Sequence, residues 1–266
     1  MHRNALRGLT LALPTVLAFS VSAQITTASG FTPAYYVQNV LLGPGVTASG
    51  FVFNGDPNQI GTFTCTTCSV NLPGGLIMGS GDISAAVGPN SNGGLTLGGG
   101  YFGMGDPDLN MLIAPDPTND RASLEFDFVA SGDSIKFNYV FASEEYLEWV
   151  GSGFQDAFGF FLSGPGIAGP YSGGAVNLAK VPGSLMTPIT INTINNVVNS
   201  AYYVDNGDGF TPPMSIDPFY VQYDGRTVTL TARAAVQCGQ TYHIKLAIAD
   251  GTDTALDCAV FLEAGS

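Results

Sequence analysis

The amino-acid sequence predicts an all-β protein, namely an antiparallel β-sandwich of jelly-roll-like type with long loops rich in Gly, Pro, Asn and Asp. Several runs alternate apolar and polar residues with a period of two, which is typical of strands with one buried face. Clusters of turn-forming residues separate these runs, and no stretch has the sustained period of a capped helix. Short strands divided by such turns are typical of sandwiches and jelly rolls.

The clearest strands lie in the second half of the chain. Apolar and polar residues alternate, as in a strand with one buried face, at residues 124–128, 135–141, 227–234 and 242–249. Residues 158–162 are apolar on both faces, as expected of a central strand. A glycine-rich stretch at residues 88–105 predicts a long flexible loop inside one domain, because the strands on either side look incomplete alone.

The N-terminal residues predict a secretory signal peptide over residues 1–23. Arg3 and Arg7 precede an apolar stretch that ends in small residues at Ala23. This leaves residues 24–266 as a single domain. No later segment approaches the ~20 apolar residues of a membrane helix. We therefore expect a secreted protein, extracellular or at the cell surface, with no membrane span after signal cleavage.

The charge balance excludes one class of partner. The chain carries eight Lys and Arg against 21 Asp and Glu, and its net charge is −13. Loss of Arg3 and Arg7 with the signal peptide would make the domain more acidic still. Such a surface repels nucleic acid and attracts cations. We expect no nucleic-acid partner.

Four cysteines in an exported chain predict two disulfides. Cys65 and Cys68 could close a small loop, which leaves Cys238 to pair with Cys258. The second pair conflicts with one arrangement of the strands. If residues 241–249 and 258–263 form a hairpin, its strands hold Cys238 and Cys258 too far apart for a disulfide. Either these strands are not hairpin partners or the pairing is wrong.

The sequence predicts no enzyme. His243 is the single histidine outside the signal peptide, so a Ser-His-Asp or Cys-His site would have to use it. His243 lies on the polar face of a strand, which is the usual position of an ordinary surface residue. A carboxylate group remains as an alternative, an unrecognised glycoside hydrolase that uses Glu144, Glu145 and Asp156.

Oxygen-bearing side chains in loops predict a calcium ion. Two adjacent glutamates end the strand at residues 135–141, and an aspartate follows shortly after. Elsewhere two aspartates and Asn110 have the spacing of the first three ligands of an EF-hand loop, although Met111 and Pro117 occupy the places of its Gly and Glu. The alternative is a set of solvated loop charges. The predicted calcium ligands are Glu144, Glu145, Asp106, Asp108 and Asp156.

Aromatic residues beside the glutamates suggest a binding surface. We expect Tyr146 and Trp149 to be exposed, where they could stack on a sugar or be buried by a partner. The predicted function is a calcium-stabilised binding module that recognises a polysaccharide or a surface protein outside the cell, in the manner of an adhesion domain. The alternative is a structural subunit of a surface assembly that self-associates.

Several segments together resemble a known family. They are residues 134–146, 156–166, 192–196, 202–206, 222–225, 237–250 and 261–266, and they resemble the choice-of-anchor L domain of bacterial surface proteins over about residues 35–266. The resemblance implies an exported domain that differing C-terminal segments attach to cells, with no established activity. The chain ends where that domain ends, which leaves open a released protein, one retained by a partner, and a truncated chain.

Overall fold

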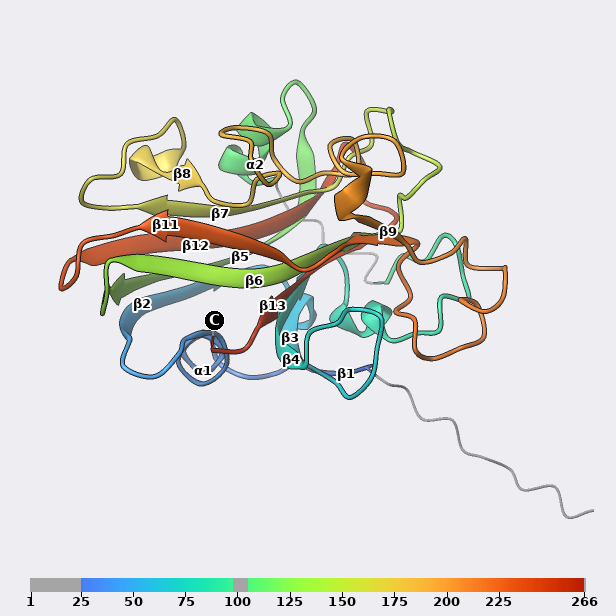
Figure 1. Cartoon of the computed structure of the whole chain (residues 1–266), viewed down its shortest axis with the longest axis horizontal. Coiled ribbons are helices and arrows are strands. Elements are labelled where there is room, and N and C mark those ends of the chain that lie inside the picture. Colours follow the sequence, from blue (N-terminus) through green and yellow to red (C-terminus); the bar gives the residue numbers. More distant parts are fainter. Residues whose placement is uncertain (1–24, 98–104, 266) are drawn as a thin grey trace, which may run out of the picture.

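A computed structural model describes residues 25–97 and 105–265 (Figure 1). The predicted signal peptide and residues 98–104 of the glycine-rich loop lie outside this part of the chain. Two antiparallel sheets pack face to face, so the predicted β-sandwich is confirmed. Successive strands from β5 to β7 and from β11 to β13 alternate between the sheets, in the manner of jelly-roll folds.

The first sheet has eight strands within the described residues. Its order is β1-β3-β4-β13-β6-β10-β9, and β11 also pairs with β6. The bounds are β1 Ile25–Ala28, β3 Ile60–Cys65, β4 Gly74–Gly79, β6 Ser134–Ser143, β9 Tyr203–Asp205, β10 Gly225–Thr227, β11 Leu230–Ala235 and β13 Cys258–Glu263.

The second sheet has five strands in the order β2-β5-β12-β7-β8. Its members are β2 Thr47–Asn54, β5 Thr118–Val129, β7 Ala157–Ser163, β8 Val176–Asn177 and β12 Thr241–Gly251. The predicted strands at residues 124–128, 158–162 and 242–249 are β5, β7 and β12. Both faces of β7 are buried, as predicted for a central strand.

Helices are short and lie in the connections. They are α1 Pro33–Tyr35, η1 Tyr36–Leu41, η2 Pro57–Gln59, η3 Ile83–Ala86, α2 Pro107–Leu112, η4 Ser172–Gly174 and η5 Ser200–Tyr202. Among the described residues, no helix combines the length and the apolar character needed to cross a membrane.

The main core fills the space between the two sheets. Aromatic rings from β6 and β7 meet there: Phe141 stacks on Phe158 with ring centroids 5.4 Å apart, and Tyr139 contacts Phe158 edge-on at 5.2 Å. A second apolar cluster lies on the other face of the eight-stranded sheet and includes Val140, Ala142 and Tyr223. Alternate residues of β6 thus enter two different cores, as a period of two requires.

The cysteine prediction is half right. Cys65 and Cys68 form the predicted disulfide. The pairing of Cys238 with Cys258 is wrong, because both are free thiols, one exposed and one buried. The two strands are not hairpin partners either, since β12 and β13 belong to different sheets, so both of the alternatives left open by the sequence hold. Cys238 precedes β12 and Cys258 follows it, so a strand of 11 residues, about 35 Å long, still separates the two thiols.

Candidate metal centre

Two carboxylates lie where the apolar core meets one end of the sandwich. The alternation that buries Ile248 in β12 reaches Asp250 two residues later. The alternation that buries Phe158 in β7 starts two residues earlier, with Asp156. Because β12 and β7 are antiparallel neighbours whose register pairs Ala249 with Ala157, the next positions bring the two carboxylates together. Both aspartates are 0% exposed.

Polar groups of the eight-stranded sheet face these aspartates. The Ser143 hydroxyl donates to Asp156 Oδ2 at 2.8 Å and accepts from the Glu145 backbone N–H at 2.9 Å. The Asp156 N–H donates to Glu145 Oε2 at 3.1 Å. One ligand atom each from Asp156, Asp250 and Cys258 lies within 4.8 Å of the others. The two sheets therefore enclose a compact group of carboxylates and a thiol.

Three carboxylate oxygens in this group have no hydrogen-bond partner. They are Oδ1 of Asp156 and both oxygens of Asp250, and none of them is accessible to solvent. An ionised carboxylate buried without a partner costs several kcal/mol. The protein alone therefore supplies no partner for these three oxygens, and either protons or a cation must compensate the negative charge.

The pKa values of the group reflect the same imbalance. Burial, followed by the nearby Asp156 carboxylate, raises the pKa of Glu145 to about 10. Burial and the neighbouring Asp250 raise the pKa of Asp156 well above its usual range. For Asp250 the causes are burial and Asp257, and the approach of the Ser80 side chain offsets only a part of the shift. Each carboxyl thus resists ionisation as long as no positive charge is present.

The donor set fits a hard cation. Carboxylate oxygens on strand ends and loops are the ligands that calcium takes, whereas softer metals favour thiolate and imidazole. The one sulfur, Cys258, is fully buried, and burial raises the pKa of its thiol well above the usual range. Sulfur is also a soft donor, which a hard cation such as calcium does not favour. Glu145, Asp156 and Asp250 would therefore be the residues that hold the ion.

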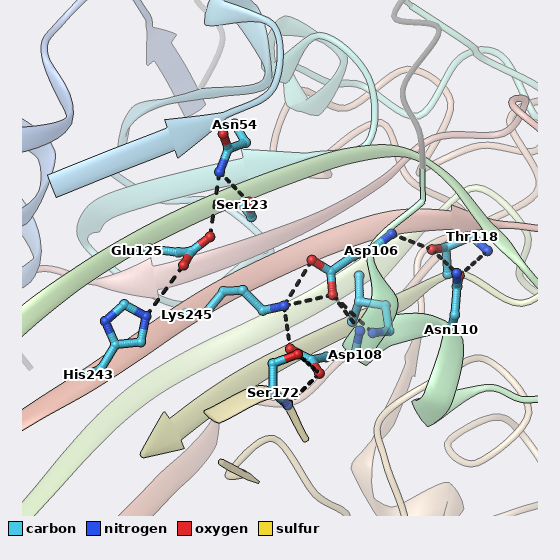
Figure 2. Close-up of polar contacts among 11 residues, drawn as sticks. Asn54, Asp106, Asp108, Asn110, Thr118, Ser123, Glu125, Ser172, His243 and Lys245 are labelled. Atoms are coloured by element: carbon cyan, nitrogen blue, oxygen red, sulfur yellow. Dashed lines mark hydrogen bonds and ion pairs between the residues drawn. The ribbon is translucent and has the colours of Figure 1, made fainter. Parts of the chain in front are cut away.

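The predicted ligands Asp106 and Asp108 lie at a different place and have a different partner. Figure 2 shows the Lys245 ammonium between their carboxylates, with Nζ 2.8 Å from Asp106 Oδ1 and 2.5 Å from Asp108 Oδ2. Asp106 also caps helix α2, accepting the N–H groups of Asp108 and Leu109. Burial alone would raise the pKa of Asp108, but the hydrogen bonds from Lys245 and Ser172 together outweigh it and lower the pKa.

The two groups lie on opposite faces of the five-stranded sheet. Lys245 alternates with the buried Leu246 of β12, and its ammonium is 5.0 Å from the ring of Phe161 on the outer face. Asp250 has the opposite phase and faces the interior. The structure therefore does not bring Asp106 and Asp108 to Glu145 and Asp156, and a lysine already compensates their charge.

The aromatic prediction is wrong for one residue and right for the other. Tyr146 is 1% exposed, because Gly225 of the neighbouring β10 leaves room for its ring, which also packs on Tyr203 at 5.0 Å. Trp149 is 40% exposed and contacts Phe154 edge-on. Only the tryptophan offers a partner the open aromatic face that was expected.

The predicted ligand set left out Asp250, Asp224 and Asp257, all of which are buried. A signal for Asp250 was present. The predicted strand alternates apolar residues at 242, 244, 246 and 248, and position 250 continues that phase with a carboxylate. A charged residue in the buried phase of a strand is uncommon unless it is paired or binds a metal. Asp224 and Asp257 lie beside short strands and gave no such pattern.

The carboxylates are poorly placed for sugar hydrolysis. Glu144 and Glu145 are 1% exposed and Asp156 is 0% exposed, whereas a glycosidase pair must face a cleft that admits the sugar. His243 lies on the outer face of β12, as predicted for a surface residue. Its Nδ1 is 2.8 Å from Asp127, and its Nε2 is 3.4 Å from Glu125.

Comparison with known proteins identifies the family. The choice-of-anchor L domain matches residues 24–266, nearly the whole chain. No curated protein and no solved structure matches this chain. The family is not a known enzyme family, and its members are associated with the bacterial surface. The chain therefore belongs to the choice-of-anchor L domain family.

Proposed function

We propose that this domain is a calcium-stabilised binding module that acts outside the cell. One calcium ion would lie between the two sheets, held by Glu145, Asp156 and Asp250. The observation that carries the proposal is Asp250, which is 0% exposed and has no hydrogen-bond partner on either carboxylate oxygen. A divalent ion at this point would relieve the repulsion between the carboxylates and join β7 and β12 to the opposite sheet.

A cleft supports the partner-binding part of the proposal. It has a volume of about 320 Å³, and Glu148, Tyr203, Asp205 and Asp208 are among the residues that line it. Glu148, Asp205 and Asp208 are exposed acidic groups of this lining, and such groups would suit a hydroxyl-rich sugar or a basic protein segment. The exposed Trp149 follows Glu148 directly in the chain and could extend the contact.

Thermal unfolding in EDTA, calcium, magnesium and zinc tests the metal. A ligand at about 100 times its Kd stabilises the folded state by about 2.7 kcal/mol. For a domain of this size that corresponds to a rise in Tm of about 5–10 °C. We expect this rise with millimolar calcium and a smaller one with magnesium. Stabilisation by zinc alone would assign the group to a thiol site and overturn the calcium proposal, as would no response to any metal.

A pair of variants separates a metal ligand from a structural residue. In EDTA, Asp250→Asn should melt at or above the native protein, because it removes a buried ionisable group. In calcium it should lack the rise in Tm. Asp133→Asn, which changes an exposed aspartate, is the matched control and should keep the full response. An undiminished calcium response in Asp250→Asn would contradict the proposed ligand set.

Partner binding is measured on arrays of bacterial polysaccharides and on immobilised surface proteins. Asp205→Asn and Glu148→Gln should weaken the binding of whichever class is captured, and Asp133→Asn should not. Capture that neither cleft variant reduces would place the partner elsewhere on the molecule.

A further inference from the structure

The adjacent glutamates 144 and 145 face opposite sides of the eight-stranded sheet. Phe141 of β6 points into the core between the sheets, and Ala142 points into the second cluster on the other face. Continuing this alternation puts Glu145 with Asp156, as its hydrogen bond shows, and turns Glu144 to the other face. The predicted pair of ligands is thus divided between two places.

On that other face, Glu144 lies in a row of polar side chains. The register pairs Ser143 of β6 with Cys258 of β13 and with Gly225 of β10, and Gly225 in turn with Asp205 of β9. One position further along each of these strands, four polar residues lie side by side. The Glu144 N–H donates to the Asp257 carbonyl at 3.2 Å, and the Asn206 N–H donates to the Asp224 carbonyl at 2.9 Å. The row is Asp257, Glu144, Asp224 and Asn206, each at most 3% exposed.

Opposed residues of antiparallel strands have Cβ atoms about 5 Å apart on the same face. The side chains of Glu144, Asp224 and Asn206 are therefore neighbours. Their place in the molecule is the end of the sandwich at which β9 lies, beside the loop that leads from β9 to β10 (Figure 1).

Hydrogen bonds fix the orientation of these side chains and leave several of their oxygen atoms without a donor. Asn206 Nδ2 donates to the carbonyls of Val221 and Tyr223, each at 2.7 Å, which sets the direction of its amide. Asn90 Nδ2 donates to Asp224 Oδ1 at 2.8 Å. Four oxygens remain without a partner in hydrogen-bond geometry, all inaccessible to solvent: Asn206 Oδ1, Asp224 Oδ2 and both oxygens of Glu144. The Gln222 side chain approaches Glu144 and offsets only a part of the rise in its pKa.

Protons alone do not satisfy this set. A proton shared between Glu144 and Asp224 would satisfy at most one acceptor beyond its donor, and Asn206 Oδ1 would still lack a partner. A single cation can be coordinated by all of these oxygens at once. Two carboxylates and an amide carbonyl are ligands that calcium takes in proteins.

We propose that Glu144, Asp224 and Asn206 hold a second divalent cation, on the opposite face of the eight-stranded sheet from the ion at Asp156 and Asp250. The inference extends the proposed function, but it stands on different residues. Water or a ligand group would complete the six to eight oxygens that calcium requires. The ion would tie β9 and β10, which are only three residues long each, to the end of β6.

Calcium titration of the EDTA-treated mature domain by calorimetry tests both sites separately. The native domain should bind two calcium ions. Asp224→Asn should lose one and retain the ion at Asp250, and Asp250→Asn should lose the other. Asp133→Asn, at an exposed aspartate outside both sites, is the matched control and should bind both ions. Circular dichroism in EDTA checks that each variant folds, and Glu144→Gln replaces Asp224→Asn if that variant does not.

The outcomes distinguish the two proposals. A single ion lost in Asp250→Asn and unaffected by Asp224→Asn or Glu144→Gln would overturn the second site alone. A single ion with the reverse behaviour would support the site at Glu144 and overturn the one at Asp250. One ion lost in both variants would mean one shared site and would overturn the second. Absence of calcium binding would overturn both.

Discussion

Asp250 and Glu144 are acidic residues in positions that a folding chain would ordinarily give to apolar side chains. Both are nearly or fully buried, and no oxygen of either carboxyl has a partner in hydrogen-bond geometry, although Gln222 approaches Glu144 and Ser80 approaches Asp250. Unpaired buried charge of this kind lowers the free energy of unfolding. These residues motivate the proposed ions, because buried carboxyls with perturbed pKa values gather at functional sites.

The buried glutamates predict an unusual dependence of stability on pH. Burial first, then Asp224 for Glu144 and Asp156 for Glu145, raises each pKa from 4.5 in an exposed chain to about 10. Between these values the folded state keeps protons that the unfolded state has released. The free energy of unfolding is therefore highest near or below pH 4.5 for these groups and falls as the pH rises toward 10.

Urea unfolding in EDTA at pH 5, 7 and 9 measures this dependence. We expect a progressive loss of stability across the series, and calcium should flatten it because an ion stabilises the charged form. Glu145→Gln should reduce the slope, whereas Glu125→Gln on the outer face should leave it unchanged. A free energy of unfolding that rises from pH 5 to pH 9 in EDTA would contradict the prediction.

The ion pairs on the outer face give a second prediction for single residues. Lys245→Met removes the cation that Asp106 and Asp108 share, although both carboxylates are almost fully buried. Breaking a buried pair from one side costs about 3–5 kcal/mol. Urea unfolding should show a loss of that order, and adding Asp108→Asn should recover part of it. A new calcium response in Lys245→Met would instead return these aspartates to the list of metal ligands.

At the scale of strands, the contact between β10 and the end of β6 depends on one glycine. A methyl group at Gly225 would lie 2.5–2.6 Å from atoms of the Tyr146 ring and its Cβ, too close for either to remain in place. Gly225→Ala should therefore cost about 1–3 kcal/mol. At Gly132 nothing lies within 4 Å of an added Cβ, so Gly132→Ala is the control. Equal stability of the two variants would contradict the packing.

Alternation in the sequence predicted the long central strands well, because β5, β6, β7 and β12 each bury one or both faces against a core. It could not predict how they pair. Whether β12 and β13 form a hairpin stayed open, because a short connection does not decide which sheet the next strand joins. Strands of three residues, such as β9 and β10, are too short to show a period, and their pairing depends on β6.

The candidate site was predictable in part for the same reason. Glu145 and Asp156 stood out by type and by position at strand ends. Asp224 and Asn206 reach Glu144 only through the order of strands in the sheet, which no local pattern reveals. The spacing of Asp106 and Asp108 was misleading because an aspartate before a proline is also a common helix cap, and here it caps α2.

At the scale of the molecule, the connecting segments expose apolar side chains. Leu185, Met186 and Val197 are each at least 80% exposed, and Phe210 is 73% exposed. These residues favour the alternative of a subunit that self-associates. Light scattering over a range of concentrations should then show a mass above that of the monomer, which Leu185→Ser with Met186→Ser reduces. A constant monomer mass with and without calcium would exclude that alternative.

The buried carboxylates also bear on where the folded chain is most stable. If the proposed calcium ions bind, the free energy of unfolding depends on the calcium concentration around the domain as well as on the protein. At calcium concentrations below the Kd the fold would remain and would lose only the contribution of the ions. The acidic end of the sandwich would then make the domain harder to unfold wherever calcium is plentiful and easier to unfold wherever calcium is withdrawn.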